Sequence, residues 1–133
     1  MSQPTAADLA RVPLFADMPD EMRSTLAERF AVKEYAAGQK VVTEGEHGYA
    51  FYAVDQGTLT VSQEARALRT LVPGDFFGEI SIIGDGRRTA TVTADGPVVV
   101  WALFGTSFRV LQSDRPDVAK AIQAAMDHRL ATD

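Results

Sequence analysis

The feature that most constrains the fold is a region, from about residue 31 to residue 104, in which short apolar runs alternate with glycine-containing turns. Runs rich in β-branched and aromatic residues at intervals of about ten residues are typical of short strands joined by tight turns. Such strands assemble into an antiparallel sandwich or barrel rather than a parallel α/β sheet, whose strands alternate with helices. The predicted strands are Val41–Val42, Ala50–Val54, Thr58–Val61, Leu68–Leu71, Thr89–Thr93 and Val98–Leu103, and the turns contain Gly38, Gly45, Gly57, Gly74 and Gly96.

Helical patterns flank this β region on both sides. Residues 5–30 carry apolar residues at helical spacing, and Pro13 interrupts the pattern. Pro19, followed by two acidic residues, suits the first turn of a second helix, where amide groups are free and the dipole favours negative charge. Residues 105–130 are helical in pattern again, and Pro116 is expected to begin a new helix.

The last of these helices carries an apolar stripe with a spacing of four residues, formed by Val118, Ile122, Met126 and Leu130. Packing on the barrel, a lid over a ligand and a homodimer seam are all open for this stripe. The whole chain, residues 1–133, is predicted to form one domain with three parts. These parts are an N-terminal helical part (about 5–30), a β-barrel (about 31–104) and C-terminal helices (about 105–130).

Composition excludes several classes of protein. The 133 residues are 46% hydrophobic, enough for a core, yet no apolar run reaches the roughly 18 residues of a membrane helix. The first five residues have neither the basic start nor the apolar run of a signal peptide. The absence of cysteine excludes disulfides and thiolate metal sites. Because the net charge is −5 and the only adjacent basic pair is Arg87–Arg88, we expect no binding to nucleic acids. Because neither a membrane helix nor a signal peptide is visible, we expect a cytoplasmic protein that does not bind membranes.

One segment, residues 74–94, has the composition of an anion-binding site. Gly78 permits a close approach of the backbone to a ligand, and Glu79–Ile83 is long enough for one helical turn with free amide groups. Arg88 supplies a planar fork of donors that matches phosphate oxygens. A glutamate beside a phosphate would be repelled by it, so the natural partner of Glu79 is a hydroxyl group, as on a ribose. A phosphate together with a ribose hydroxyl indicates a nucleotide.

This segment resembles the phosphate-binding cassette of the cyclic-nucleotide-binding domain family. The family pattern is Phe-Gly-Glu, aliphatic residues, a short loop and then Arg-x-Ala-Thr-Val. Here it runs from Phe77 to Val92, with Glu79 and Arg88 nine positions apart. The resemblance covers roughly residues 7–126. It implies a mainly β fold with flanking α-helices, an antiparallel β-barrel of the double-stranded β-helix or jelly-roll type.

The resemblance also implies a role for individual residues. Arg88 would pair with the cyclic phosphate, and Glu79 would accept a hydrogen bond from the ribose 2′-hydroxyl. Gly78 would permit the close approach of the backbone. Val61 and Leu68 match positions that line the base pocket in family members. Backbone amides near three further residues would complete the phosphate cradle, namely Ile80, Ser81 and Thr89.

The ligand implied by the resemblance is cAMP or cGMP, with cAMP favoured, and no cofactor is implied. Thr89 follows the cassette arginine in members that respond to either nucleotide, so it does not decide between them. Arg87 departs from the family pattern, in which many members carry proline. The implied mechanism is that Ile82 contacts Phe108, so that phosphate capture moves the C-terminal helices. The C-terminal helix would then be a surface for a protein partner or a homodimer.

Two other functions compete with the sensor. One is an interaction module of the same fold with a vestigial nucleotide pocket, which the presence of Arg88 and Glu79 disfavours. The other is a metal enzyme in a similar barrel, which two histidines distant in sequence, His47 and His128, cannot supply with ligands. No Ser–His–Asp arrangement is visible, and we expect no enzymatic activity. Met1 favours a stand-alone protein over an excised domain, and both remain open.

Overall fold

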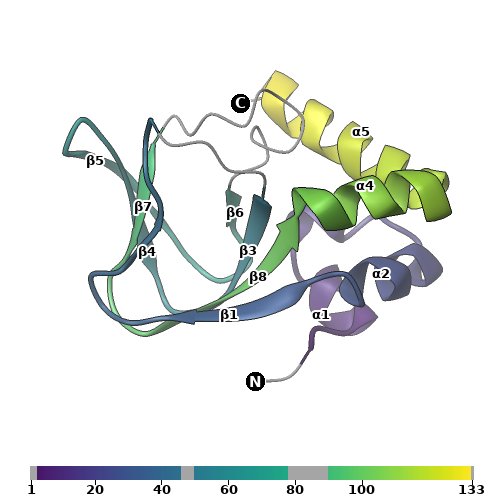
Figure 1. Ribbon diagram of the computed structural model, residues 1–133, viewed down its shortest axis with the longest axis horizontal. Coiled ribbons are helices and arrows are strands. Elements are labelled where there is room, and N and C mark those ends of the chain that lie inside the picture. The colour runs from purple at the N-terminus through teal and green to yellow at the C-terminus, as the bar shows by residue number, and fades with distance from the viewer. Residues whose placement is uncertain (1–2, 46–49, 78–89, 133) are drawn as a thin grey trace.

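The computed structural model describes residues 3–45, 50–77 and 90–132. Helices lie at both ends of the chain and strands lie between them (Figure 1). The N-terminal elements are α1 (Ala6–Ala10), the 3-10 helix η1 (Pro13–Phe15) and α2 (Asp20–Ala27). The strands are β1 (Ala31–Tyr35), β2 (Lys40–Val42), β3 (Ala50–Gln56), β4 (Leu59–Gln63), β5 (Arg66–Leu71), β6 (Phe76–Phe77), β7 (Thr91–Ala94) and β8 (Val98–Phe104). The C-terminal helices are α4 (Gly105–Asp114) and α5 (Pro116–Thr132).

The helices begin at residues that favour helix starts. At α1, the Thr5 hydroxyl accepts a hydrogen bond from the Asp8 amide at 3.2 Å, and the Asp8 carboxylate accepts one from the Thr5 amide at 2.9 Å. This reciprocal pair is a capping box. Pro19 immediately precedes α2, and Pro116 is the first residue of α5, so both predicted helix starts are confirmed. The predicted break at Pro13 is the start of η1.

The strands form two four-stranded antiparallel sheets, in the orders β1-β8-β3-β6 and β2-β7-β4-β5. The expected fold class, mainly antiparallel β with flanking helices, is confirmed. In the described residues, no strand of one sheet pairs with a strand of the other. The two sheets are therefore not closed into the expected barrel. The strands at the sheet edges are also short or irregular, since β6 has two residues and β2 pairs with β7 through a shifted register.

The predicted strand runs correspond to β2, β3, β4, β5, β7 and β8, with ends that move by a few residues. Of the run Thr89–Thr93, Thr89 lies outside the described residues, and β7 begins at Thr91. Two strands were not among the predicted runs. β1 has exposed polar residues, Lys33 and Glu34, within an edge strand, and β6 lies in a segment that was interpreted only as a ligand loop.

β3 and β8 are buried on both faces, and their alternate residues enter two different cores. In β8, Val98, Val100 and Ala102 face the second sheet, whereas Trp101 and Leu103 face the helices. In β3, Tyr52 faces the second sheet and Phe51 faces the helices. Burial on both faces explains why these two strands are continuously apolar rather than alternating.

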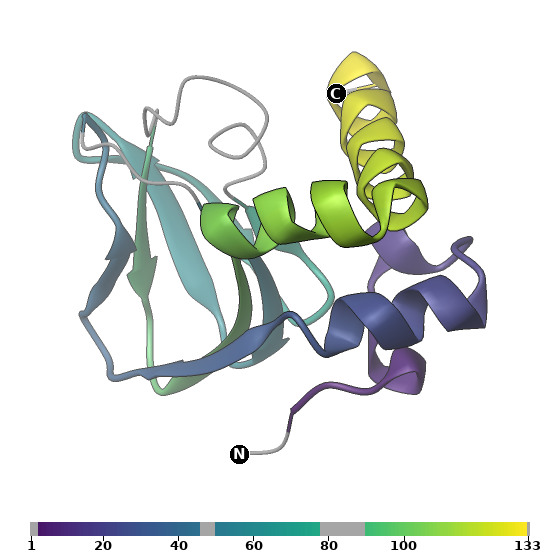
Figure 2. The ribbon, with the colours of Figure 1, turned by 45° about the vertical axis from the view of Figure 1, so that its right-hand side comes forward.

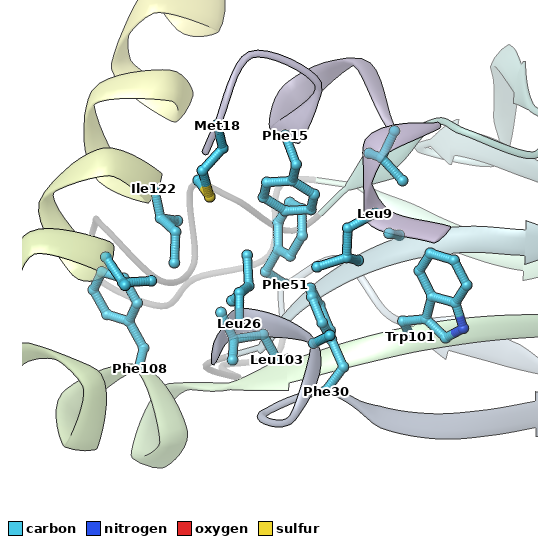
Figure 3. Packing of buried hydrophobic residues seen from close by; sticks show 14 of the residues in the cluster. Leu9, Phe15, Met18, Leu26, Phe30, Phe51, Trp101, Leu103, Phe108 and Ile122 are labelled. Carbon is cyan, nitrogen blue, oxygen red and sulfur yellow. The ribbon is translucent and has the colours of Figure 1, made fainter. Parts of the chain in front are cut away.

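The core on the helical side lies between the helices and the sheet that contains β3 and β8, and Figure 3 shows its side chains converging from both. Phe51 is the central ring, with ring centroids 5.9 Å from Phe15 and 5.6 Å from Phe76. From α5, Val118 and Ile122 enter this core and are fully buried. The first half of the apolar stripe on α5 therefore packs within the chain, as one of the three alternatives predicted. Figure 2 shows all the helices gathered at one end of the sheets.

Candidate nucleotide-binding site

Most of the predicted site residues fall in the segment 78–89, which lies outside the described residues. They are Gly78, Glu79, Ile80, Ser81, Arg88 and Thr89, together with Ile82 and Arg87. His47 also lies outside the described residues, and for His128 only the helical backbone is described. The assignments to the phosphate and the ribose therefore stay predictions. The described part of the site consists of the two anchors of this segment and of the strands that carry Val61 and Leu68.

The segment 78–89 connects the two sheets, because it follows β6 in one sheet and precedes β7 in the other. At its beginning, Phe77 is buried between the sheets and stacks on Tyr52, with ring centroids 4.9 Å apart and planes 15° apart. At its end, Thr91 and Val92 are buried in β7. Large buried side chains thus hold both ends of the predicted cassette.

Val61, predicted to line the base pocket, is 7% exposed and belongs to the core between the sheets. In the sheet it pairs with Val92 of β7 on one side and with Arg69 of β5 on the other. Val61 therefore lies beside β7, the strand in which the predicted cassette ends. This arrangement is compatible with the predicted role of Val61, which no described contact tests.

Leu68, the second residue predicted to line the base pocket, lies in a β-bulge. Val61 pairs with Arg69 and Ser62 pairs with Ala67, which leaves Leu68 without an opposite residue. Its side chain is 54% exposed, a large value for leucine. It lines a hollow of about 440 Å³ together with Gln63, Glu64 and Arg66. Leu68 is thus available to a ligand or to another segment, whereas Val61 is already packed.

The structure adds a residue that sequence reasoning missed, Glu44 in the turn after β2. Its backbone amide donates to the Thr91 hydroxyl at 3.0 Å, and its carboxylate accepts from the Glu64 amide at 2.9 Å. Glu44 therefore contacts both the first residue of β7 and the turn between β4 and β5. No sequence pattern singles out these contacts, since Glu44 is one of many acidic residues and its partners lie 47 and 20 positions away.

The C-terminal helices join the site region directly, because α4 begins at Gly105 where β8 ends. Phe108 on α4 is 5% exposed and packs in the helical core with Leu111 and Ile122. The predicted partner of Phe108, Ile82, lies outside the described residues. Packed side chains around Phe108 therefore connect β8 to α5. The contact between Ile82 and Phe108 stays a prediction.

Among the described residues, no group of three or more histidine, aspartate or glutamate side chains is placed to hold a metal ion. Within the same residues, no helix combines the length and apolar character that crossing a membrane requires. Burial raises the pKa of the Tyr35 phenol, and the nearby Tyr52 adds to the shift. Because this shift moves the phenol further from neutral pH, Tyr35 stays protonated beside the core between the sheets.

Comparison with known proteins decides the family. The model of the cyclic nucleotide-binding domain matches residues 32–115, a span that includes the whole motif from Phe77 to Val92. The chain belongs to this family. The match begins in β1 and ends at Arg115, between α4 and α5. The resemblance seen in the sequence is thus confirmed.

Two curated relatives of this cyclic nucleotide-binding domain are kinase proteins. The chain is 34% identical over 114 residues to a cAMP-dependent protein kinase regulatory subunit of Debaryomyces hansenii. This match covers 85% of the chain and 25% of the relative. It is 35% identical over 119 residues to the cGMP-dependent protein kinase egl-4 of Caenorhabditis briggsae, covering 84% of the chain and 16% of the relative. The chain therefore spans a quarter or less of the length of these two relatives.

A solved structure matches over nearly its full length. It is the N-terminal domain of a transcriptional regulator from Streptomyces coelicolor, with a TM-score of 0.81 and 31% identity. The match covers 94% of the chain and 93% of that structure. Cyclic nucleotide-binding domains of this size and fold are thus similar both to parts of kinase proteins and to part of a transcriptional regulator.

Proposed function

We propose that this chain binds a cyclic nucleotide, with cAMP favoured over cGMP, and acts as a regulatory sensor without catalytic activity. The observation that carries the proposal is the family match, which contains the complete cassette motif with Glu79 and Arg88 at the family spacing. A cAMP-dependent and a cGMP-dependent kinase protein both match, so the relatives support the ligand class more strongly than the choice of base. Residues 1–133 would act as one binding unit.

In this proposal each cassette residue has one role. Arg88 pairs with the cyclic phosphate, because its planar fork of donors matches two phosphate oxygens. Glu79 accepts a hydrogen bond from the ribose 2′-hydroxyl, and Gly78 lets the backbone approach. The amides near Ile80, Ser81 and Thr89 complete the phosphate cradle. The base lies against Val61 and Leu68, and the exposure of Leu68 supports this placement because a ligand would cover an apolar side chain.

The output would pass through the C-terminal helices. Phosphate capture rearranges the segment that contains Ile82, and Ile82 acts on Phe108. Phe108 shares a core with Ile122, so a displacement of α4 reaches α5 through packed side chains. Coupling of this kind is typically worth about 1–3 kcal/mol. α5 would then present a changed surface to a protein partner.

The proposal is tested by thermal denaturation and calorimetry with cAMP, cGMP and AMP. A nucleotide at about 100 times its Kd should stabilise the protein by roughly 2.7 kcal/mol, which raises the melting temperature by several degrees. We expect stabilisation by a cyclic nucleotide, none by AMP, and loss of binding in Arg88→Ala. Arg109→Ala, which removes an exposed arginine of α4, is the matched control and should bind normally. If neither cyclic nucleotide binds the wild-type chain, the protein is instead an interaction module with a vestigial pocket.

A further inference from the structure

Glu44 joins three segments that are far apart in the sequence. It lies in the turn two residues after the end of β2, its amide donates to the Thr91 hydroxyl at the start of β7, and its carboxylate accepts from the Glu64 amide in the β4–β5 turn. Thr91 itself pairs with Ser62 of β4. The three segments therefore meet at one end of the second sheet, and Glu44 contributes a contact to each of the other two.

The bond to Thr91 is partly buried. Thr91 itself is 7% exposed. Its hydroxyl accepts the Glu44 amide at 3.0 Å. Removing the hydroxyl would leave that amide without its partner close to the core, a loss that typically costs more than the bond itself contributes. The backbone at Glu44 is thus held against the first residue of β7.

The bond to Glu64 supports an unfavourable backbone conformation. Glu64 and Ala65 have φ values of 52° and 65°, in the left-handed region that asparagine and glycine occupy more readily. Residues other than glycine hold this conformation only where their surroundings stabilise it. The Glu44 carboxylate accepts the Glu64 amide at 2.9 Å, and a hydrogen bond to a charged acceptor is stronger than a neutral one. Glu44 is therefore a tertiary contact that holds this strained turn.

The two partners of Glu44 belong to different halves of the proposed site. Thr91 starts the strand that continues the cassette, whereas the β4–β5 hairpin carries Val61 and Leu68. We infer that Glu44 is a positioning residue, which fixes the base side of the nucleotide site relative to the strand that follows the phosphate side. This inference rests on the proposed function, because it assigns Glu44 a part in the same binding event. Glu44 would act through Thr91 and the hairpin, without contacting the ligand.

The test compares Glu44→Ala with Glu44→Gln and Thr91→Val, and uses Glu34→Ala, an exposed glutamate of β1, as the matched control. Amide hydrogen exchange in the ligand-free protein should show faster exchange at Glu64 in Glu44→Ala only. Calorimetry with cAMP, performed well below the melting temperature of each variant, should show about tenfold weaker binding in Glu44→Ala. Glu44→Gln should recover most of the affinity because its amide oxygen still accepts the Glu64 amide.

Non-additivity separates positioning from a general loss of stability. Because the two bonds form one chain of contacts, Glu44→Ala combined with Thr91→Val should bind cAMP little worse than the weaker single variant. Wild-type affinity in Glu44→Ala, or an equal loss in Glu34→Ala, would overturn the inference. An equal loss in Glu44→Gln would overturn the assignment to the hydrogen bond. Absence of binding by the wild-type chain would overturn the proposed function and this inference with it.

Discussion

The guanidinium of Arg115 lies 2.7 Å from the carboxylate of Glu21 and so joins the junction of α4 and α5 to α2. Arg115 also donates to the Thr25 hydroxyl on α2 and to the carboxylate of Asp117 in the first turn of α5, each at 2.9 Å. The backbone of Arg115 is not helical, with φ −137° and ψ 71°, which separates the two helices. The place where the C-terminal helices change direction is thus held by the N-terminal helices.

This arrangement predicts a pH-dependent contribution of Arg115 to stability. Hydrogen bonds from Arg115 lower the pKa of the Asp117 carboxyl, and the Val118 amide lowers it further. A carboxylate whose pKa is lowered on folding stabilises the folded state above its unfolded pKa of about 3.9, and this stability is lost as the pH falls through the folded value. Hydrogen bonds to Asp117 and Glu21 raise the pKa of Arg115, which stays charged throughout.

The measurement is an NMR titration of the Asp117 carboxyl in the wild-type protein and in Arg115→Gln. We expect the Asp117 pKa to rise most of the way to about 3.9 in the variant. In urea denaturation the wild type should be more stable than the variant at neutral pH, and the difference should shrink as the pH falls below about 4. Arg109→Gln should change neither quantity. An Asp117 pKa that is the same in wild type and Arg115→Gln would contradict the prediction.

The glycine turns give a second prediction, at Gly57 between β3 and β4. Its φ is 86°, and a Cβ placed there would lie 2.5 Å from the Pro97 carbonyl oxygen and 2.7 Å from a methyl group of Val98. Gly57→Ala therefore combines left-handed strain with a clash against backbone, and should lower the free energy of unfolding by roughly 2–5 kcal/mol.

Two matched variants separate strain from clash, with urea denaturation as the measurement. Gly38 has a φ of 84° with nothing within 4 Å of its Cβ position, so Gly38→Ala should cost only roughly 1–2 kcal/mol. Gly96 has neither a positive φ nor a neighbour within 4 Å, so Gly96→Ala should change stability by no more than about 0.5 kcal/mol. A Gly57→Ala cost no larger than that of Gly38→Ala would show that the clash is relieved by local movement.

These glycines also show what local sequence can predict in this fold. Gly57 marks a turn because no other residue fits there, and β3 before it is continuously apolar because both of its faces are buried. The β4–β5 turn was not predicted, because Glu64 and Ala65 are poor turn residues. In this turn the Glu64 amide donates to the Glu44 carboxylate, a tertiary contact that no local pattern encodes.

The candidate site also contains residues that a local pattern identifies and features that depend on long-range pairing. The cassette motif is contiguous, so residues such as Glu79 and Arg88 could be selected from spacing and from resemblance. The exposure of Leu68 could not, because it belongs to an edge strand in which Arg66–Thr70 are all exposed. The barrel was expected and the described strands form two separate sheets, because pairing between the short edge strands is not encoded in a local pattern. Local patterns thus identify the strands, and long-range pairing decides how they assemble.

The apolar stripe on α5 gives the last prediction. Ile122 is fully buried in the core formed by α2, α4 and the first sheet, so within the single chain its side chain is already covered. Ile122→Ala should lower the free energy of unfolding by about 2–5 kcal/mol, through lost burial and the cavity left behind. Lys120→Ala, on the exposed side of the same helix, should change it by no more than about 0.5 kcal/mol.

Denaturation at several protein concentrations distinguishes core packing from a homodimer seam. If Ile122 packs only within the chain, the effect of Ile122→Ala on the melting temperature is the same at low and at high concentration. If Ile122 also stabilises a dimer, the wild-type melting temperature rises with concentration and the variant loses this dependence, because association adds stability by mass action. We expect the first outcome, since a side chain with no exposed surface in the monomer has none left to bury against a second copy.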